Sequence, residues 1–198
     1  GWEMVLLTHE IVKKKDPLDD SSKNNFLKKY HESCKEVLTE NSWEPKILQS
    51  YLDKVRKLQI SSDLDKWINL HKPFLEVISF IQTAQANGLK IGIVSTKGSV
   101  FTSKILSKFN LFPELIFGYE AGTKVEIISN LIEEYEIIGF IEDRKKTLLN
   151  IKKNYKTNKI RCFLADWGYL KRSDRVNLPK EIRLLKLRDL KNILANSD

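Results

Sequence analysis

Cysteine and histidine are scarce in this chain, and long apolar runs are absent. The 198 residues include two cysteines, Cys34 and Cys162, and three histidines that form no ligand-spaced pair. Such scarcity argues against a disulfide framework and against a soft-metal site, and isolated cysteines are typical of reduced, structural thiols in cytosolic proteins. No apolar run approaches the roughly 18 residues of a membrane span, and the first residues do not resemble a signal peptide. We therefore expect a cytoplasmic protein without a membrane segment.

The charge of the chain is positive but evenly distributed. Lys and Arg number 34 against 26 Asp and Glu, which gives a net charge of +8. An excess of this sign attracts phosphates, in small molecules or in nucleic acids. The lysines are interleaved with acids, however, which is more typical of solvated helix faces, and the sequence has no arginine and aromatic module of a nucleic-acid reader. Nucleic acid is therefore not the expected partner.

The first 72 residues have the pattern of helices. Helices are predicted over Asn25–Leu38 and Glu44–Leu58, and the second has apolar residues at the i, i+3, i+4, i+7 spacing of an amphipathic helix. The run Met4–Val12 is ambiguous, since it is apolar enough for a short strand and also fits a helix face. Three aromatic residues are expected in the core of this part: Trp43, Tyr51 and Trp67.

From Pro73 the pattern changes to alternating helices and strands, so a boundary is predicted between residues 72 and 73. Such alternation with short links predicts an α/β fold, a Rossmann-like parallel sheet with flanking helices. The expected helices are Phe74–Asn87, Ser99–Phe109, Val125–Tyr135, Lys145–Tyr155 and Leu187–Leu194. The expected strands are Leu89–Val94, Leu115–Tyr119, Ile137–Ile141, Ile160–Ala165 and Ile182–Leu187.

Two of these strands end in clusters of reactive side chains. Neither Ile91–Val94 nor Ile137–Ile141 alternates, which is typical of strands buried on both faces. The first is followed by Ser95, Thr96 and Lys97, and the second by Glu142, Asp143 and Arg144. Ligands of open parallel sheets bind outside the carboxyl ends of the strands. If the two strands are neighbours or near neighbours, these side chains share one rim that suits a phosphoryl group and a divalent metal.

In this order, the motifs resemble those of the haloacid dehalogenase superfamily of phosphatases and related hydrolases. The strand with Ser95 matches the second motif of the family, Lys124 after Gly122-Thr123 matches the third, and Glu142-Asp143 matches the fourth in its acidic-pair form. The turn at residues 166–169, Asp-Trp-Gly-Tyr, is similar to the phosphoglycolate-phosphatase-like branch. The resemblance covers residues 73 to about 170, and it implies a helical cap at 1–72 and a Rossmann-like core at 73–198.

The resemblance also implies roles for the matching residues. Ser95 would hydrogen-bond the transferring phosphoryl group, with Thr96 beside it, and Lys124 would neutralise the charge shared by nucleophile and phosphate. Asp143 would bind Mg²⁺ with support from Glu142. Each residue also has an ordinary structural interpretation: a strand-end hydroxyl, a lysine at a helix start, or a carboxylate beside a helix N-terminus.

The first motif of the family, a strand ending in Asp-x-Asp, has no match. The one Asp-x-Asp, Asp63-Leu64-Asp65, follows no apolar strand, and we interpret it as a helix N-terminus. The first strand and its nucleophile are then expected upstream of Gly1. Because that strand lies mid-sheet in the family, the core should have a gap. Met4–Val12 could fill it, a second copy could lend a strand, or the flanking strands could close up.

These expectations lead to a first functional hypothesis and two alternatives. The first is a Mg²⁺-dependent phosphatase that acts on a small phosphorylated metabolite through an aspartyl-phosphate, with little or no turnover in this chain, because the nucleophile is missing. The second is a non-catalytic relative that binds a phosphorylated ligand or a protein partner. The third is a phosphatase that processes nucleic-acid ends. The sequence predicts neither the substrate nor the oligomeric state.

Overall fold

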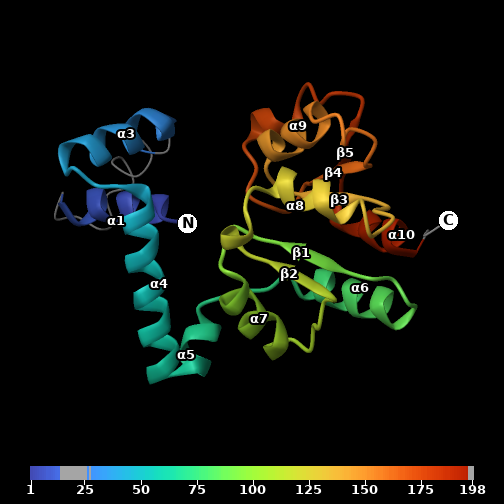
Figure 1. Cartoon of the computed structure of the whole chain (residues 1–198), viewed down its shortest axis with the longest axis horizontal. Helices are drawn as coiled ribbons and strands as arrows, with labels where there is room; N and C mark the ends of the chain where they lie inside the picture. Colours follow the sequence, from blue (N-terminus) through green and yellow to red (C-terminus); the bar gives the residue numbers. More distant parts are fainter. Residues whose placement is uncertain (14–25, 27, 196–198) are drawn as a thin grey trace. The chain divides into compact units, whose positions relative to one another are not determined.

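The computed structural model describes residues 1–13, 26 and 28–195, and it divides the chain into two compact units (Figure 1). The first unit is Gly1–His71 and the second is Lys72–Asp198. The division falls one residue before the boundary predicted at Pro73. Among the described residues, no helix is both long enough and apolar enough to cross a bilayer.

The first unit is built from helices in the part of it that the structure describes. These are α1 (Glu3–Lys13), α3 (Tyr30–Glu40), α4 (Pro45–Ser62) and α5 (Leu64–Asn69). The ambiguous run Met4–Val12 thus lies within a helix. Proline at the first position of α4 suits a helix start, and Asp63 caps α5 by accepting a hydrogen bond of 2.9 Å from the amide of Lys66. The prediction that Asp63 marks a helix N-terminus is confirmed. The core of this unit contains Leu6, Leu7, Phe26, Cys34, Val37 and Leu48.

The apolar side of α4 is divided between the core and the surface. Leu48 is buried, but Tyr51 is 63% exposed, so the prediction that Tyr51 belongs to the core is wrong. Three more exposed apolar residues lie at helical spacing with it: Ile47, Val55 and Leu58. Ile47 directly precedes the buried Leu48, so the exposed residues lie on a side of α4 that the described part of the unit leaves uncovered. Trp67 is buried and Trp43 packs against the core, as predicted.

The second unit contains the predicted alternation of helices and strands. Its helices are α6 (Leu75–Ala86), α7 (Ser99–Lys108), α8 (Lys124–Leu131), α9 (Lys145–Lys153) and α10 (Leu190–Ala195). Its strands are β1 (Gly92–Val94), β2 (Leu115–Phe117), β3 (Phe140–Glu142), β4 (Cys162–Ala165) and β5 (Ile182–Leu185). Short 3-10 turns lie at Tyr119–Ala121, Arg172–Arg175 and Leu187–Asp189. The strands are shorter than predicted, because the apolar runs continue beyond the residues that pair.

The strands form two parallel sheets in the described part of the chain, not one. β1 pairs with β2, and β4 lies between β3 and β5. The structure is therefore mixed α/β, with parallel pairing as predicted. Two of the three ways to fill the expected gap do not occur in it: Met4–Val12 is helical, and β1 and β3 do not pair.

Helices cover both faces of the three-stranded sheet. Cys162 and Leu164 of β4 pack in a cluster with Leu148 and Ile151 of α9 and with Ile128 of α8. Phe163, between them in sequence, points to the opposite face and packs in a cluster with residues of α6 and α10. Successive residues of a strand point to opposite faces. The unbroken apolar sequence of β4 is therefore explained by helices on both sides.

Candidate functional site

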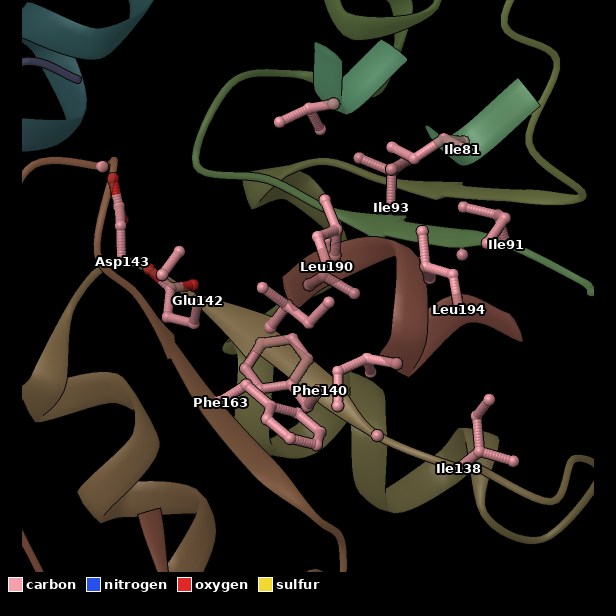
Figure 2. Close-up of a pocket in the computed structure, with 18 of the residues that line it drawn as sticks. Ile81, Ile91, Ile93, Ile138, Phe140, Glu142, Asp143, Phe163, Leu190 and Leu194 are labelled. Carbon is pink, nitrogen blue, oxygen red and sulfur yellow. The ribbon is translucent and has the colours of Figure 1, made fainter. Parts of the chain in front are cut away.

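A cavity of about 470 Å³ lies between β1 and β3 of the second unit. Figure 2 shows Glu142 and Asp143 at one end of it and the apolar side chains of both strands, α6 and α10 along its length. Its apolar lining includes Ile81, Ile91, Ile93, Ile138, Phe140, Phe163, Leu190 and Leu194. Three predicted site residues also line it, namely Lys124, Glu142 and Asp143.

Lys124 and Glu142 form an ion pair at the polar end of the cavity. Lys124 is the first residue of α8, whose start is fixed by a capping box between Thr123 and Glu126. Glu142 ends β3, and its side chain is 5% exposed. Its other oxygen accepts a hydrogen bond of 3.1 Å from the amide of Arg144. The buried carboxylate therefore has partners for both oxygens, as a buried charge requires.

Asp143 joins the loop after β3 to the loop after β4. Its Oδ2 accepts a hydrogen bond of 2.9 Å from the amide of Tyr169. The close approach needs a glycine, because a Cβ added to Gly168 would lie 2.2 Å from the Cβ of Asp143. Glycine is the residue that permits such contact between backbones. This contact fixes the Asp143 carboxylate beside that of Glu142.

Ser95 and Thr96 follow β1 but do not line the cavity. The residue before them, Val94, does line it. The Ser95 amide donates to the carbonyl of Phe117 on β2 at 2.8 Å, and the Ser95 hydroxyl accepts from the amide of Lys97 at 3.0 Å. This matches the alternative interpretation of Ser95 as a strand-end hydroxyl. Of the predicted site residues, Lys124, Glu142 and Asp143 therefore line one cavity, and Ser95 and Thr96 are not among the residues that line it.

Several contributors to this end of the molecule were not predicted. The amide of Arg144 donates to Glu142 and the amide of Tyr169 donates to Asp143. Every residue except proline has a backbone amide, so the sequence does not indicate which amides bind a carboxylate. Asp166 at the end of β4 pairs with Arg175, nine residues later in the chain. The turn at residues 166–169 stands out in the sequence only by its resemblance to one branch of the family. Its structural role lies in Gly168 and the amide of Tyr169, and no side-chain pattern indicates it.

The environment of Glu142 raises its pKa above the ordinary value of 4.5. Burial is the main cause; the charge of Lys124 opposes it, and the neighbouring Asp143 carboxylate raises the pKa further. The folded protein therefore holds this proton more tightly than the unfolded chain does. The stability from this site is fully present below pH 4.5 and is lost as the pH rises through the raised pKa.

Glu142→Gln is expected to remove the pH-dependent loss of stability that the raised pKa of Glu142 causes. Urea unfolding at a series of pH values should show that the wild-type free energy of unfolding, relative to the variant, falls as the pH rises above 4.5. Glu126→Gln is the matched control of opposite sign, because hydrogen bonds from Thr123 lower the pKa of Glu126. The wild-type free energy of unfolding, relative to the Glu126→Gln variant, should instead decrease as the pH falls through the lowered pKa of Glu126. Parallel profiles for both variants would contradict the raised pKa of Glu142.

The carboxylates at this site do not form a ready metal cage. Among the described residues, no group of three or more His, Cys, Asp or Glu side chains is placed to hold a metal ion. Glu142 is occupied by Lys124 and the Arg144 amide, so Asp143 is the carboxylate better placed for a cation. Comparison with known proteins returned no matching family model, no matching curated protein and no matching solved structure.

Proposed function

We propose that the second unit carries part of the active site of a Mg²⁺-dependent phosphohydrolase of the haloacid dehalogenase type. The observation that supports this most is the meeting of Lys124, Glu142 and Asp143 at one end of the cavity. Lys124 is the first residue of α8, Glu142 is the last residue of β3 and Asp143 follows it. Residues distant in sequence therefore supply one positively charged and two negatively charged side chains. A phosphorylated small molecule with a bound cation complements such a set.

The oxygen chemistry of the site fits Mg²⁺ in part. Mg²⁺ often uses one or two protein carboxylates and completes its shell with water and substrate phosphate. Asp143 would bind the cation directly. Glu142 would add negative charge beside it while it keeps its hydrogen bond with Lys124. When bound, the metal would neutralise phosphate charge. Lys124 would do the same from the helix start, where the N-terminal amides of α8 also favour an anion.

Hydrolysis through an aspartyl-phosphate would also require the nucleophile of the first motif, and the one Asp-x-Asp of the sequence does not follow a strand. The acidic pair Asp63 and Asp65 lies at the start of α5 in the first unit, where Asp63 is a helix cap. We therefore expect the chain to bind a phosphate and a cation but to release little or no phosphate from a generic aryl phosphate with Mg²⁺. Turnover in this chain that survives Asp143→Asn would exclude the assigned metal role.

Binding of Mg²⁺ in the presence of inorganic phosphate tests the proposal directly. Isothermal titration should detect a Mg²⁺ site that Asp143→Asn weakens by about tenfold or more. Asp189→Asn removes an equal charge from an exposed aspartate that lies 3.9 Å from Arg188, and it should leave the affinity unchanged. Equal Mg²⁺ affinities for the wild type and both variants would rule out a Mg²⁺ site at Asp143.

A non-catalytic binding protein is the alternative, and the engagement of Lys124 by Glu142 favours it. A lysine already paired with a buried carboxylate has less charge to offer a phosphate. This alternative predicts that phosphate or a partner binds without Mg²⁺ and that the melting temperature does not respond to the metal. A melting temperature that rises with Mg²⁺ in the wild type but not in Asp143→Asn favours the hydrolase.

A further inference from the structure

The exposed apolar residues of α4 form one row along the helix, which runs from α1 and α3 to α5 (Figure 1). Ile47, Tyr51, Val55 and Leu58 are between 50% and 63% exposed. At 3.6 residues per turn they fall within about 80° of the helix circumference and extend over about 17 Å of its length. Three of them are spaced four residues apart, which is the ridge that packs into the groove of another helix. The row therefore has the dimensions of a contact with a single helix.

One side of this row carries only positive charge. Lys46, Lys54 and Lys57 are exposed, and at helical spacing all three fall on the same side of the row, which we call the lysine edge. None of the described acidic residues forms an ion pair with them. The one acid of α4, Asp53, is buried and pairs with Arg56 at 2.8 Å. The charge that α4 presents to a partner is therefore positive.

The surroundings of the row discriminate between possible partners. Opposite the lysine edge, the row adjoins Leu48, which is buried in the core of the unit. A helix that lies in a membrane surface sinks its apolar face by about 5–10 Å, and the packed side of α4 opposes this. A second copy in an antiparallel pair would bring its own lysine edge to the contact, where like charges repel. Geometry and charge therefore favour one helix with acidic residues beside its apolar row.

We propose that the exposed row of α4 is a docking site for an amphipathic helix of another protein, whose apolar side chains pack on the row and whose Glu or Asp side chains face the lysine edge. Anchors three and four residues apart are the usual means by which such helices are recognised. Tyr51 lies within the row, and tyrosine is enriched among the residues that dominate interfaces. The inference does not depend on the proposed hydrolase function, because all its residues belong to the first unit.

Two designed peptides are the probes for this site. Both are helical, about 18 residues long, with Leu at every third or fourth position; one has Glu along one side of the Leu row, and the other has Lys there. Calorimetric titration of the full chain should give a Kd below about 1 mM for the Glu peptide and an affinity about tenfold or more lower for the Lys peptide. NMR spectra should place the largest shift changes at Tyr51, Val55 and Leu58.

Val55→Asn tests the apolar part of the contact. It should weaken binding of the Glu peptide by about fivefold or more, because the row loses an apolar side chain at its centre. Val12→Asn is the matched control, since it makes the same change at a residue of α1 that is 66% exposed. This control should leave the affinity unchanged.

Reversal of charge tests the lysine edge. The double variant Lys54→Glu and Lys57→Glu should reverse the preference, so that the Lys peptide binds about tenfold or more tightly than the Glu peptide. The double variant Lys28→Glu and Lys35→Glu changes the net charge equally at two other exposed lysines of the first unit. It should keep the preference for the Glu peptide, which separates local complementarity from the attraction of an overall charge of +8.

Several results would overturn the proposal. One is the absence of saturable binding up to about 1 mM Glu peptide, and another is equal affinity for both peptides. A larger loss of stability in Val55→Asn than in Val12→Asn, measured by urea unfolding, would mean that the row is already packed within the chain. Sedimentation that shows a dimer which Val55→Asn abolishes would assign the row to a second copy. Binding to phosphatidylserine vesicles that Val55→Asn abolishes would assign it to a membrane surface.

Discussion

Leu148→Ala is expected to lower the free energy of unfolding of the second unit by about 3–5 kcal/mol. The side chain of Leu148 is completely buried, in the cluster that joins α8 and α9 to the three-stranded sheet. Truncation removes its apolar contacts and leaves a cavity that rigid neighbours cannot fill. Urea denaturation followed by circular dichroism should show a lower midpoint with an unchanged slope.

Leu75→Ala is the control, because it makes the same chemical change on α6 at a leucine that is 71% exposed. It should alter the free energy of unfolding by no more than about 0.5 kcal/mol. Equal effects of the two substitutions would mean that the packing of α9 on the sheet does not carry the stability of this unit.

Gly168→Ala is expected to disturb the candidate site. The added Cβ would lie 2.2 Å from the Cβ of Asp143 and 2.8 Å from its Oδ2, so the loop after β4 and the carboxylate must separate. The hydrogen bond from the Tyr169 amide would be lost or lengthened. We expect a destabilisation of about 1–3 kcal/mol and, if Mg²⁺ binds at Asp143, an affinity lower by about tenfold or more.

Gly92→Ala is the matched control for this prediction. A Cβ at Gly92 would meet the Cβ of Leu115 at 3.9 Å, an ordinary contact. Alanine also restricts the unfolded chain, so this variant should be neutral or slightly more stable. Thermal unfolding and Mg²⁺ titration of both variants give the comparison. A Gly168→Ala protein with wild-type affinity would show that the position of Asp143 does not matter for the cation.

Local patterns in the sequence predicted the elements of the second unit well. The β-branched runs before Ser95 and Glu142 contain strands, and helices begin at Ser99 and Lys145 as expected. Such features depend on neighbouring residues, whose periodicity and caps are visible in the sequence. The division of α4 into a buried and an exposed apolar side was not predictable in this way. It depends on which helices cover α4, and periodicity cannot report that.

The family resemblance implied that Lys124, Glu142 and Asp143 share one site, but the specific pairs between distant residues were not predicted. Lys124 and Glu142 are 18 residues apart in the chain, and Asp143 is 26 residues from its partner Tyr169. The strand-end rule predicted one rim for the side chains that follow β1 and β3, but of these only Glu142 and Asp143 line the cavity. Ser95 lies on the other sheet, where the hydrogen bond to Phe117 holds its backbone. β1 and β3 belong to different sheets. Which strands pair depends on contacts between distant parts of the chain, so the composition of each strand does not predict it.

Each unit contains one buried cysteine, and the two provide separate built-in reporters. Cys34 lies in the core of the first unit and Cys162 in that of the second, both as free thiols. Burial raises the pKa of both thiols, which keeps them protonated and unreactive while the units are closed. Alkylation by a thiol reagent must therefore wait for local opening. Mass spectrometry of the two modified peptides then gives the opening kinetics of each unit from a single sample, without an added label.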